Sequence, residues 1–185
     1  ASVSITCADG SIRLIASEDG ALRWEKNLHR SLTSPAALCG WLLLAGASDG
    51  TVNAVAAEDG APRWSKQLDG AITASPACHG DQAWVGGTGD RLHALRLGRR
   101  RARIRWSYRT GSDITVAPRY ASEQILLSPL DTWLYALHAD NGHLAWRTRI
   151  GKRPAGSGAL LGDLFVVAPL NGEGLEMFRL SDGSH

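Results

Sequence analysis

One phrase recurs along the chain, and this repeat restricts the folds that the chain can adopt. It runs DGTVNAVAAEDGAPRW at Asp49–Trp64 and DGSIRLIASEDGALRW at Asp9–Trp24. Looser copies occupy Gly89–Trp106 and Asp131–Trp146, and a fifth, Asn171–Gly183, ends before its tryptophan. In the two clear copies an Asp-Gly turn marks each end of a short apolar strand, because Asp-Gly tolerates the positive φ of a tight hairpin. The pattern predicts a repeat protein built from short strands.

Two independent markers keep the same period. Four tryptophans follow one another at intervals of 40, 42 and 40 residues: Trp24, Trp64, Trp106 and Trp146. A Ser-Pro-Ala marker, or its remnant, follows each tryptophan, and its positions are 41, 42 and 40 residues apart: Pro35, Pro76, Pro118 and Gly158. Because the two markers agree, the repeat length is 40 to 42 residues.

The second copy shows how one repeat divides into strands. We expect four of them, at Leu32–Ala36, Trp41–Ala45, Thr51–Ala57 and Arg63–Leu68, joined by short connections that contain Gly, Asp or Asn. No long window has the i, i+3, i+4 spacing of an amphipathic helix. Four antiparallel strands per repeat are typical of a propeller blade. The predicted fold class is therefore all-β: a β-propeller, or an arc of one, made of four-stranded blades.

The repeats cover the chain from end to end, so we predict a single β-propeller region over residues 1–185. Its blades are expected at about residues 1–30 (partial), 31–70, 71–111, 112–151 and 152–185 (partial). When the copies are aligned, the first lacks its first strand, and the last lacks its fourth strand and its tryptophan. The chain begins in mid-repeat and Ala1–Cys7 has no signal-peptide pattern. We therefore expect a fragment of a larger protein, with the true N-terminus elsewhere.

The fourth copy carries the clearest family likeness. Its Tyr135-Ala136-Leu137 strand, Asn141-Gly142 turn and Trp146 resemble the PQQ-like, or quinoprotein-type, β-propeller repeat. The family's docking motif places Ala, Asp, Thr-Gly and Trp at fixed intervals. Its alanine, glycine and tryptophan places are filled by Ala54, Gly60, Trp64, Ala136, Gly142 and Trp146, and less closely by Leu14, Gly20 and Trp24, whereas the aspartate place holds Ala16, Ala56 or His138.

This resemblance carries expectations about size and role. It implies that the chain is part of a ring of about seven or eight blades. The family includes the propeller lipoprotein of the bacterial outer-membrane assembly machinery, propeller domains of adenylate-forming enzymes, and PQQ- and calcium-dependent dehydrogenases. Because one fold carries such different roles, the resemblance specifies the architecture more closely than the function.

The recurring tryptophans have a physical reason to recur. An indole on the fourth strand can lie over the glycine turn of a neighbouring blade, and its N–H can bond a backbone carbonyl. Burying that area stabilises each interface by roughly 2–3 kcal/mol, and glycine leaves out the Cβ that would block the contact. The predicted structural blade anchors are Trp24, Trp64, Trp106, Trp146, Gly20, Gly60 and Gly142.

The third copy departs from the pattern in its last hairpin. In place of a two-residue turn it carries a run rich in arginine: Arg99, Arg100, Arg101, Arg103 and Arg105. One interpretation is a solvated hairpin whose charges keep the sheet edge from pairing. The other is a patch that docks an acidic partner, a phosphate or lipid headgroups. Specific nucleic-acid recognition is not expected, because the interleaved aromatics of a single-strand platform are missing.

Composition excludes several classes of protein. The net charge is only +2, with 44% apolar and 21% charged residues, which argues against a nucleic-acid binder or an acidic solvating chain. No apolar run is long enough for a transmembrane segment. Cys7, Cys39 and Cys78 form no CxxC pair, so we expect three free thiols, which favour a reducing compartment. The sequence still leaves periplasm and cytoplasm both open.

Motifs for catalysis are missing. The sequence has no GxSxG, HExxH or P-loop, and His138 and His143 lack the companions of a zinc site. The family's dehydrogenases hold PQQ between a tryptophan and a disulfide of adjacent cysteines, beside calcium. No adjacent cysteines or calcium-type cluster occur here. We therefore predict no catalytic, cofactor or metal residues. The expected function is a non-catalytic scaffold for another protein, or for another domain of the same polypeptide. The alternative is a fragment of a PQQ- and calcium-dependent dehydrogenase propeller.

Overall fold

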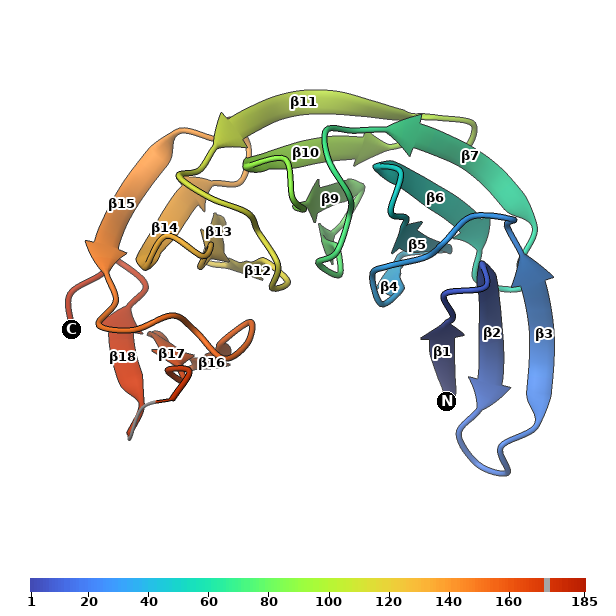
Figure 1. Cartoon of the computed structure of the whole chain (residues 1–185), viewed down its shortest axis with the longest axis horizontal. Coiled ribbons are helices and arrows are strands. Elements are labelled where there is room, and N and C mark those ends of the chain that lie inside the picture. Colours follow the sequence, from blue (N-terminus) through green and yellow to red (C-terminus); the bar gives the residue numbers. More distant parts are fainter. Residues whose placement is uncertain (172–173) are drawn as a thin grey trace.

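The computed structural model of the chain describes residues 1–171 and 174–185, and in this part all regular structure is strand. Eighteen strands form five antiparallel sheets of three, four, four, four and three strands, which we call blades 1 to 5. Figure 1 shows the blades standing side by side along an arc, with β3, β7, β11 and β15 on its convex side. The all-β class and the propeller arc are as predicted. Gly172 and Glu173 of the fifth copy lie outside the described residues.

The strands follow the repeat closely. Blade 1 holds β1 (Ser2–Thr6), β2 (Ser11–Ala16) and β3 (Leu22–Asn27). Blade 2 holds β4 (Ala37–Cys39), β5 (Leu42–Gly46), β6 (Thr51–Ala56) and β7 (Pro62–Gln67). Blade 3 holds β8 (Ala77–His79), β9 (Gln82–Val85), β10 (Arg91–Leu97) and β11 (Ala102–Arg109). Blade 4 holds β12 (Arg119–Ala121), β13 (Gln124–Leu127), β14 (Trp133–His138) and β15 (Leu144–Arg149). Blade 5 holds β16 (Ala159–Leu161), β17 (Leu164–Val167) and β18 (Glu176–Arg179).

The first strand of blade 2 lies further along the chain than predicted. The sequence placed it at Leu32–Ala36, but β4 begins at Ala37 and pairs with β5 around Gly40, which has φ of +63°. Because Pro35 has no N–H to donate to a strand ladder, the segment before β4 does not pair as a strand. It serves as the connector from blade 1. Only Leu32 makes a bridge there, to Ala47.

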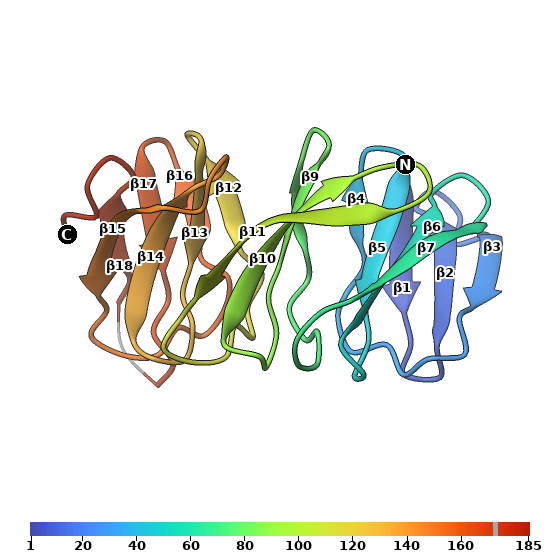
Figure 2. The same cartoon turned by 90° about the horizontal axis from the view of Figure 1, so that it is seen from above.

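The turns lie on two opposite faces of the arc (Figure 2). One, the hairpin face, carries the turns between the first and second and between the third and fourth strands of a blade. Ala57 N donates to Trp41 O over 2.9 Å and joins two such turns. The other, the connector face, carries the turns between the second and third strands and the links between blades. There Leu68 N donates to Gly50 O over 2.9 Å.

Neighbouring blades enclose the core. Each of the four interfaces holds one apolar cluster, and the middle strands β5 and β6 are buried along their whole length because blades cover both of their faces. Val3 and Ile5 lie on the face of blade 1 that no neighbouring blade covers, and they are 52% and 41% exposed. Their equivalents in blade 2, Leu43 and Ala45, are 2% and 0% exposed because blade 1 covers them. Burial therefore depends on the presence of a neighbouring blade.

In residues 1–171 and 174–185, the structure contains no helix with the length and apolar character required to cross a bilayer.

Candidate functional site

The tryptophans at the ends of the repeats join successive blades. Trp24 Nε1 donates to Ala57 O over 3.1 Å, and a Cβ added to Gly60 would lie 2.6 Å from the Trp24 ring. Trp106 lies in the same way against Gly142. Its indole N–H bonds the carbonyl three residues before that glycine, Ala139 O, over 3.1 Å. Because these glycines have no Cβ, the indole ring can lie directly against the backbone of the turn.

The glycine turn of blade 5 is covered by an indole in the same way, whereas that of blade 1 is not. Trp146 Nε1 donates to Leu180 O over 2.9 Å, and the ring covers Gly183, a contact that the predicted anchors did not include. Gly20, which the sequence named as an anchor, has φ of +72° but no atom within 4 Å of its Cβ direction. Its turn is a docking position without an indole.

Trp64 contacts the arginine-rich hairpin. Its Nε1 donates to Gly98 O over 3.0 Å, so the anchoring bond survives although the Asp-Gly turn is gone. The hairpin closes by a bond from Gly98 N to Arg101 O over 3.0 Å, and Leu97 pairs with Ala102 at its base. The longer turn therefore keeps the blade interface and adds a projecting tip.

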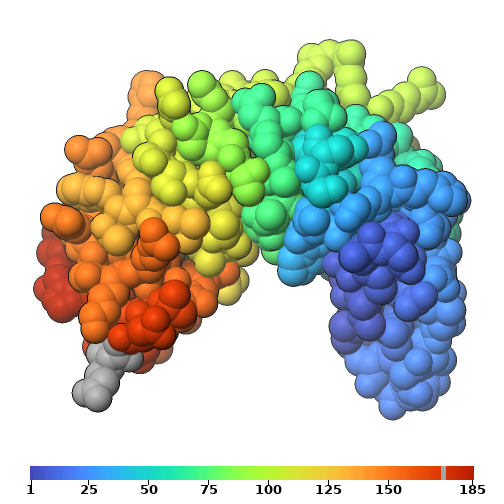
Figure 3. All heavy atoms as spheres, in the orientation of Figure 1, coloured from blue at the N-terminus to red at the C-terminus, as the bar shows by residue number. Residues whose placement is uncertain are grey.

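This tip reverses the charge of its counterparts. The corresponding turns of the other blades carry exposed acids: Glu18, Asp19, Glu58, Asp59, Asp140 and Asp182. All five predicted arginines are exposed, and among the described residues none of them makes an ion pair. In Figure 3 the yellow-green side chains of this region project from the outer edge of the molecule. Among the described residues, the third blade therefore presents unpaired positive charge where the corresponding turns of the other blades carry acids.

The structure divides the five arginines among different surroundings. Arg99 and Arg100 line a cavity of ≈ 410 Å³ together with Trp41 and Arg63 of blade 2. Arg101 and Arg103 line another cavity, of ≈ 280 Å³, together with Arg96. Arg105 lines neither of them. Four of the five arginines thus line two small cavities, and whether they bind a partner stays a prediction.

Trp41 and Arg63 were missed by sequence reasoning. Trp41 is not one of the repeat tryptophans, and it is 45% exposed at the β4–β5 turn. The Arg63 guanidinium lies 5.6 Å from the centre of its ring, within reach of a cation–π interaction. Arg63 is also the extra residue of a β-bulge, since Ala54 pairs with Trp64 and Val55 with Pro62. Bulges redirect side chains. The available signal in the sequence was that Trp41 falls outside the tryptophan repeat.

A second cavity, of ≈ 300 Å³, continues the first toward the inner strands, and the two share Trp41 and Arg99. We call the combined space the blade 2–3 groove. The inner part is lined by the turns of β4–β5, β8–β9 and β10–β11. Its one acid, Asp81, is paired with Arg96 over 2.9 Å. The groove therefore has an aromatic and cationic outer half and a mainly backbone and apolar inner half.

A disulfide lies at the inner end of this groove and corrects the prediction of three free thiols. Cys39 of β4 is bonded to Cys78 of β8, with their Cα atoms 5.4 Å apart, while Cys7 is free. The bond links the innermost strands of blades 2 and 3. Disulfides persist in oxidising compartments, so this bond argues against the reducing compartment that free thiols would favour.

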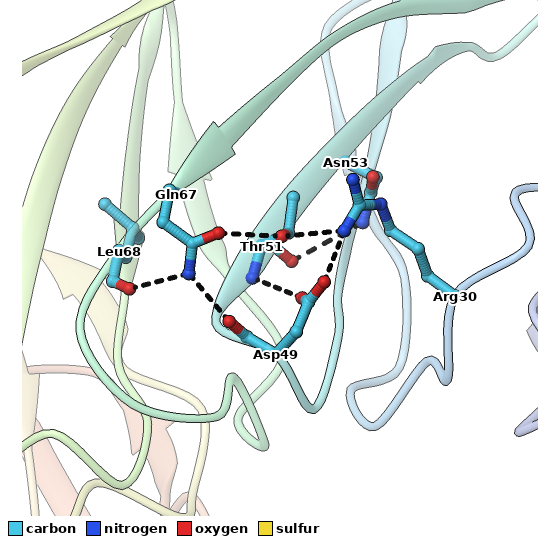
Figure 4. Close-up of polar contacts among 6 residues, drawn as sticks. All are labelled: Arg30, Asp49, Thr51, Asn53, Gln67 and Leu68. Atoms are coloured by element: carbon cyan, nitrogen blue, oxygen red, sulfur yellow. Dashed lines mark hydrogen bonds and ion pairs between the residues drawn. The ribbon is translucent and has the colours of Figure 1, made fainter.

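Polar networks hold the connector face (Figure 4). Asp49 accepts from Thr51 N over 2.9 Å and pairs with Arg30 of the preceding connector. Gln67 Nε2 donates to Asp49 O and, over 3.2 Å, to Leu68 O. Burial raises the pKa of Asp49, but its bonds to Thr51 and Arg30 outweigh this and hold the pKa below its usual value. These groups satisfy one another, which suits a structural role.

Asp131 has the equivalent role in blade 4. It accepts from Gly111 N over 3.2 Å, from Trp133 N over 3.1 Å and from Tyr135 Oη over 2.6 Å. Burial and this last bond raise the pKa of Tyr135 to about 12. The carboxylate therefore ties the connector from blade 3 to the third strand of blade 4.

His93 is the most deeply buried histidine among the described residues. Ser107 Oγ lies 2.8 Å from its Nδ1, and Asp69 Oδ2 lies 3.7 Å from its Nε2. Burial lowers the pKa of His93, although Asp69 partly opposes the shift. None of the cavities described above borders this group. Within the described part of the chain, no three His, Cys, Asp or Glu side chains gather as metal ligands would.

Tryptophan-to-glycine docking between successive antiparallel sheets defines the class of protein: a β-propeller of PQQ-like blades. The chain belongs to the family described as outer membrane protein assembly factor BamB, which matches residues 8–166. No curated protein matches the chain.

Two solved structures have a similar fold. BamB from Moraxella catarrhalis superposes with a TM-score of 0.83 at 20% identity, over 96% of this chain and 55% of that one. The computationally designed Ika8 protein superposes with a TM-score of 0.80 at 13% identity, over the same shares. At such low identity the likeness concerns the fold alone. The chain spans about half the length of either structure.

Proposed function

We propose that the chain is a non-catalytic scaffold, which presents loops of its hairpin face to a partner protein or to another domain of the same polypeptide. The observation that carries the proposal is the β10–β11 hairpin. Its exposed arginines lie beside an exposed tryptophan and have no acidic partner among the described residues. Packed like charges cost a little stability, while Trp64 keeps its anchoring bond to Gly98. The added charge brings no structural gain, which favours a binding role.

The competing function is part of a PQQ- and calcium-dependent dehydrogenase. In the family's enzymes PQQ stacks on a disulfide of adjacent cysteines, whereas Cys39 and Cys78 are 39 residues apart and on different blades. These residues do not fit that cofactor site, so the proposal includes no cofactor. Titration with PQQ and calcium, followed by quinone absorbance and dye reduction, separates the two functions. Tight binding with turnover would end the scaffold proposal.

A photo-crosslinking residue at position 100 in the producing cell should capture the partner, while one at Asp140, on the acidic hairpin of blade 4, serves as the matched control. The partner should then bind the purified chain. Changing Arg99, Arg100 and Arg101 to serine should leave the melting temperature nearly unchanged and weaken that binding, most of all at low salt. Binding that is equal at every ionic strength would show that the hairpin is only a solvated turn.

A further inference from the structure

The blade 2–3 groove has the form of a site for an extended peptide. Its inner half is lined by three exposed turn glycines, Gly40, Gly80 and Gly98. Gly40 and Gly80 have open space where a side chain would project. Leu97, which is partly exposed, supplies apolar lining. A peptide backbone can therefore approach the turns, with apolar side chains turned inward.

The outer half of the groove is suited to carboxylates. Arg63 comes from β7 and Arg99 and Arg100 from the β10–β11 hairpin, so positive charge reaches the cavity from two blades. Trp41 lines the same cavity, is 45% exposed and offers a flat apolar surface. Arginine binds carboxylates in planar, two-pronged geometry, and tryptophan and arginine are both enriched among the residues that contribute most to binding energy at interfaces.

The surrounding charge argues against a flat anionic partner. A membrane or a duplex lying on the hairpin face would also meet the acids of the neighbouring hairpins, Glu58 and Asp59 on blade 2 and Asp140 on blade 4. Like charges brought together in this way are repelled. A narrow acidic segment in the groove avoids those hairpins. The charge around the groove therefore favours a short stretch of polypeptide over an extended surface.

We propose that the blade 2–3 groove binds an extended acidic segment of a partner protein, with its carboxylates on Arg63, Arg99 and Arg100 and an apolar side chain on Trp41. This inference rests on the proposed scaffold function and names the chemistry of the partner. Because exposed ion pairs are screened by salt, the affinity falls steeply as ionic strength rises.

The test uses a fluorescein-labelled peptide, Glu-Asp-Glu-Leu-Glu-Asp-Glu, in fluorescence anisotropy titrations of the whole chain at low and high salt. The peptide with Gln and Asn in place of its acids is the uncharged control. Binding of the acidic peptide should weaken about tenfold or more in Arg99→Ser/Arg100→Ser and in Trp41→Ala. Trp41→Phe should retain most of it. Arg23→Ser/Arg149→Ser removes the same charge from exposed positions on other blades and should change the affinity less than twofold.

The possible outcomes separate the inference from the function on which it rests. Equal binding by Arg99→Ser/Arg100→Ser and by the control variant, or no binding of the acidic peptide at low salt, would overturn the inference. So would tighter binding to phosphatidylglycerol-containing vesicles, to a single-stranded oligonucleotide or to inorganic phosphate. In each case the scaffold function would stand if the crosslinked protein still bound. Turnover with PQQ and calcium would instead contradict the proposed scaffold function itself. Circular dichroism of each variant verifies that the fold is intact.

Discussion

The Cys39–Cys78 disulfide should provide a large share of the stability of the chain. It closes a loop with a sequence separation of 39 residues. The chain-entropy relation gives a loop of this length about 4 kcal/mol, because the bond restricts the unfolded chain more than the folded one. For a chain of this size, each kcal/mol shifts the melting temperature by about 2–4 °C, so removing the bond should lower it by about 8–16 °C.

The assays are thermal melting and guanidinium denaturation of the wild-type chain, Cys39→Ala/Cys78→Ala and Cys7→Ser, each with and without a reductant. The wild type and Cys7→Ser should lose stability when reduced, since both keep the bond. The double variant should have the same low stability with and without reductant. The effect of reductant on the wild type therefore measures the bond separately from any packing effect of the lost sulfurs. Reasoning from the loop would be refuted if the oxidised and reduced wild type unfolded at the same denaturant concentration. It would also fail if alkylation without reductant labelled three thiols.

Three further results are expected from single changes. Gly142→Ala should destabilise more than Gly20→Ala by about 1–3 kcal/mol in denaturation, because both have positive φ but only Gly142 is covered by an indole; equal losses would contradict indole docking. The depressed pKa of His93 means that the unfolded chain binds more protons below its usual value of 6.5. Stability should therefore be complete above pH 6.5 and decline as the pH falls, and His93→Gln should flatten this part of the pH–stability curve. Tyr135, with its pKa raised to about 12, should stay neutral while the unfolded chain ionises near pH 10, so stability should be lost as pH rises from 10 toward 12. Tyr135→Phe should remove that alkaline loss. It should also lower the stability by about 1 kcal/mol at neutral pH, because the hydrogen bond to Asp131 is missing. If the stability of Tyr135→Phe fell between pH 10 and 12 as it does in the wild type, this assignment to Tyr135 would be wrong.

The sequence alone determined the blade and its period. Turn chemistry is local, since Asp-Gly and Asn-Gly specify hairpins wherever they occur, and the tryptophan spacing records a contact that every repeat makes with the next. The carbonyl that accepts the indole N–H lies three residues before the docked glycine in three interfaces, at Ala57, Ala139 and Leu180. Such repeated contacts can be inferred from one copy because the neighbouring blade is another copy of the same pattern.

The contacts that occur once were decided only by the tertiary structure. Cys39 and Cys78 stand one place apart in the repeat, since Cys39 pairs with Leu42 in β5 but Cys78 with Ala83, the second residue of β9. On a strand, one place reverses the direction of the side chain. The cysteines therefore face each other across the blade 2–3 interface, although they form no CxxC pair in the sequence. Trp41 and Arg63 likewise meet the β10–β11 hairpin only because blade 3 follows blade 2 in the arc. Local pattern specifies each blade, but packing between particular blades creates the disulfide and the groove.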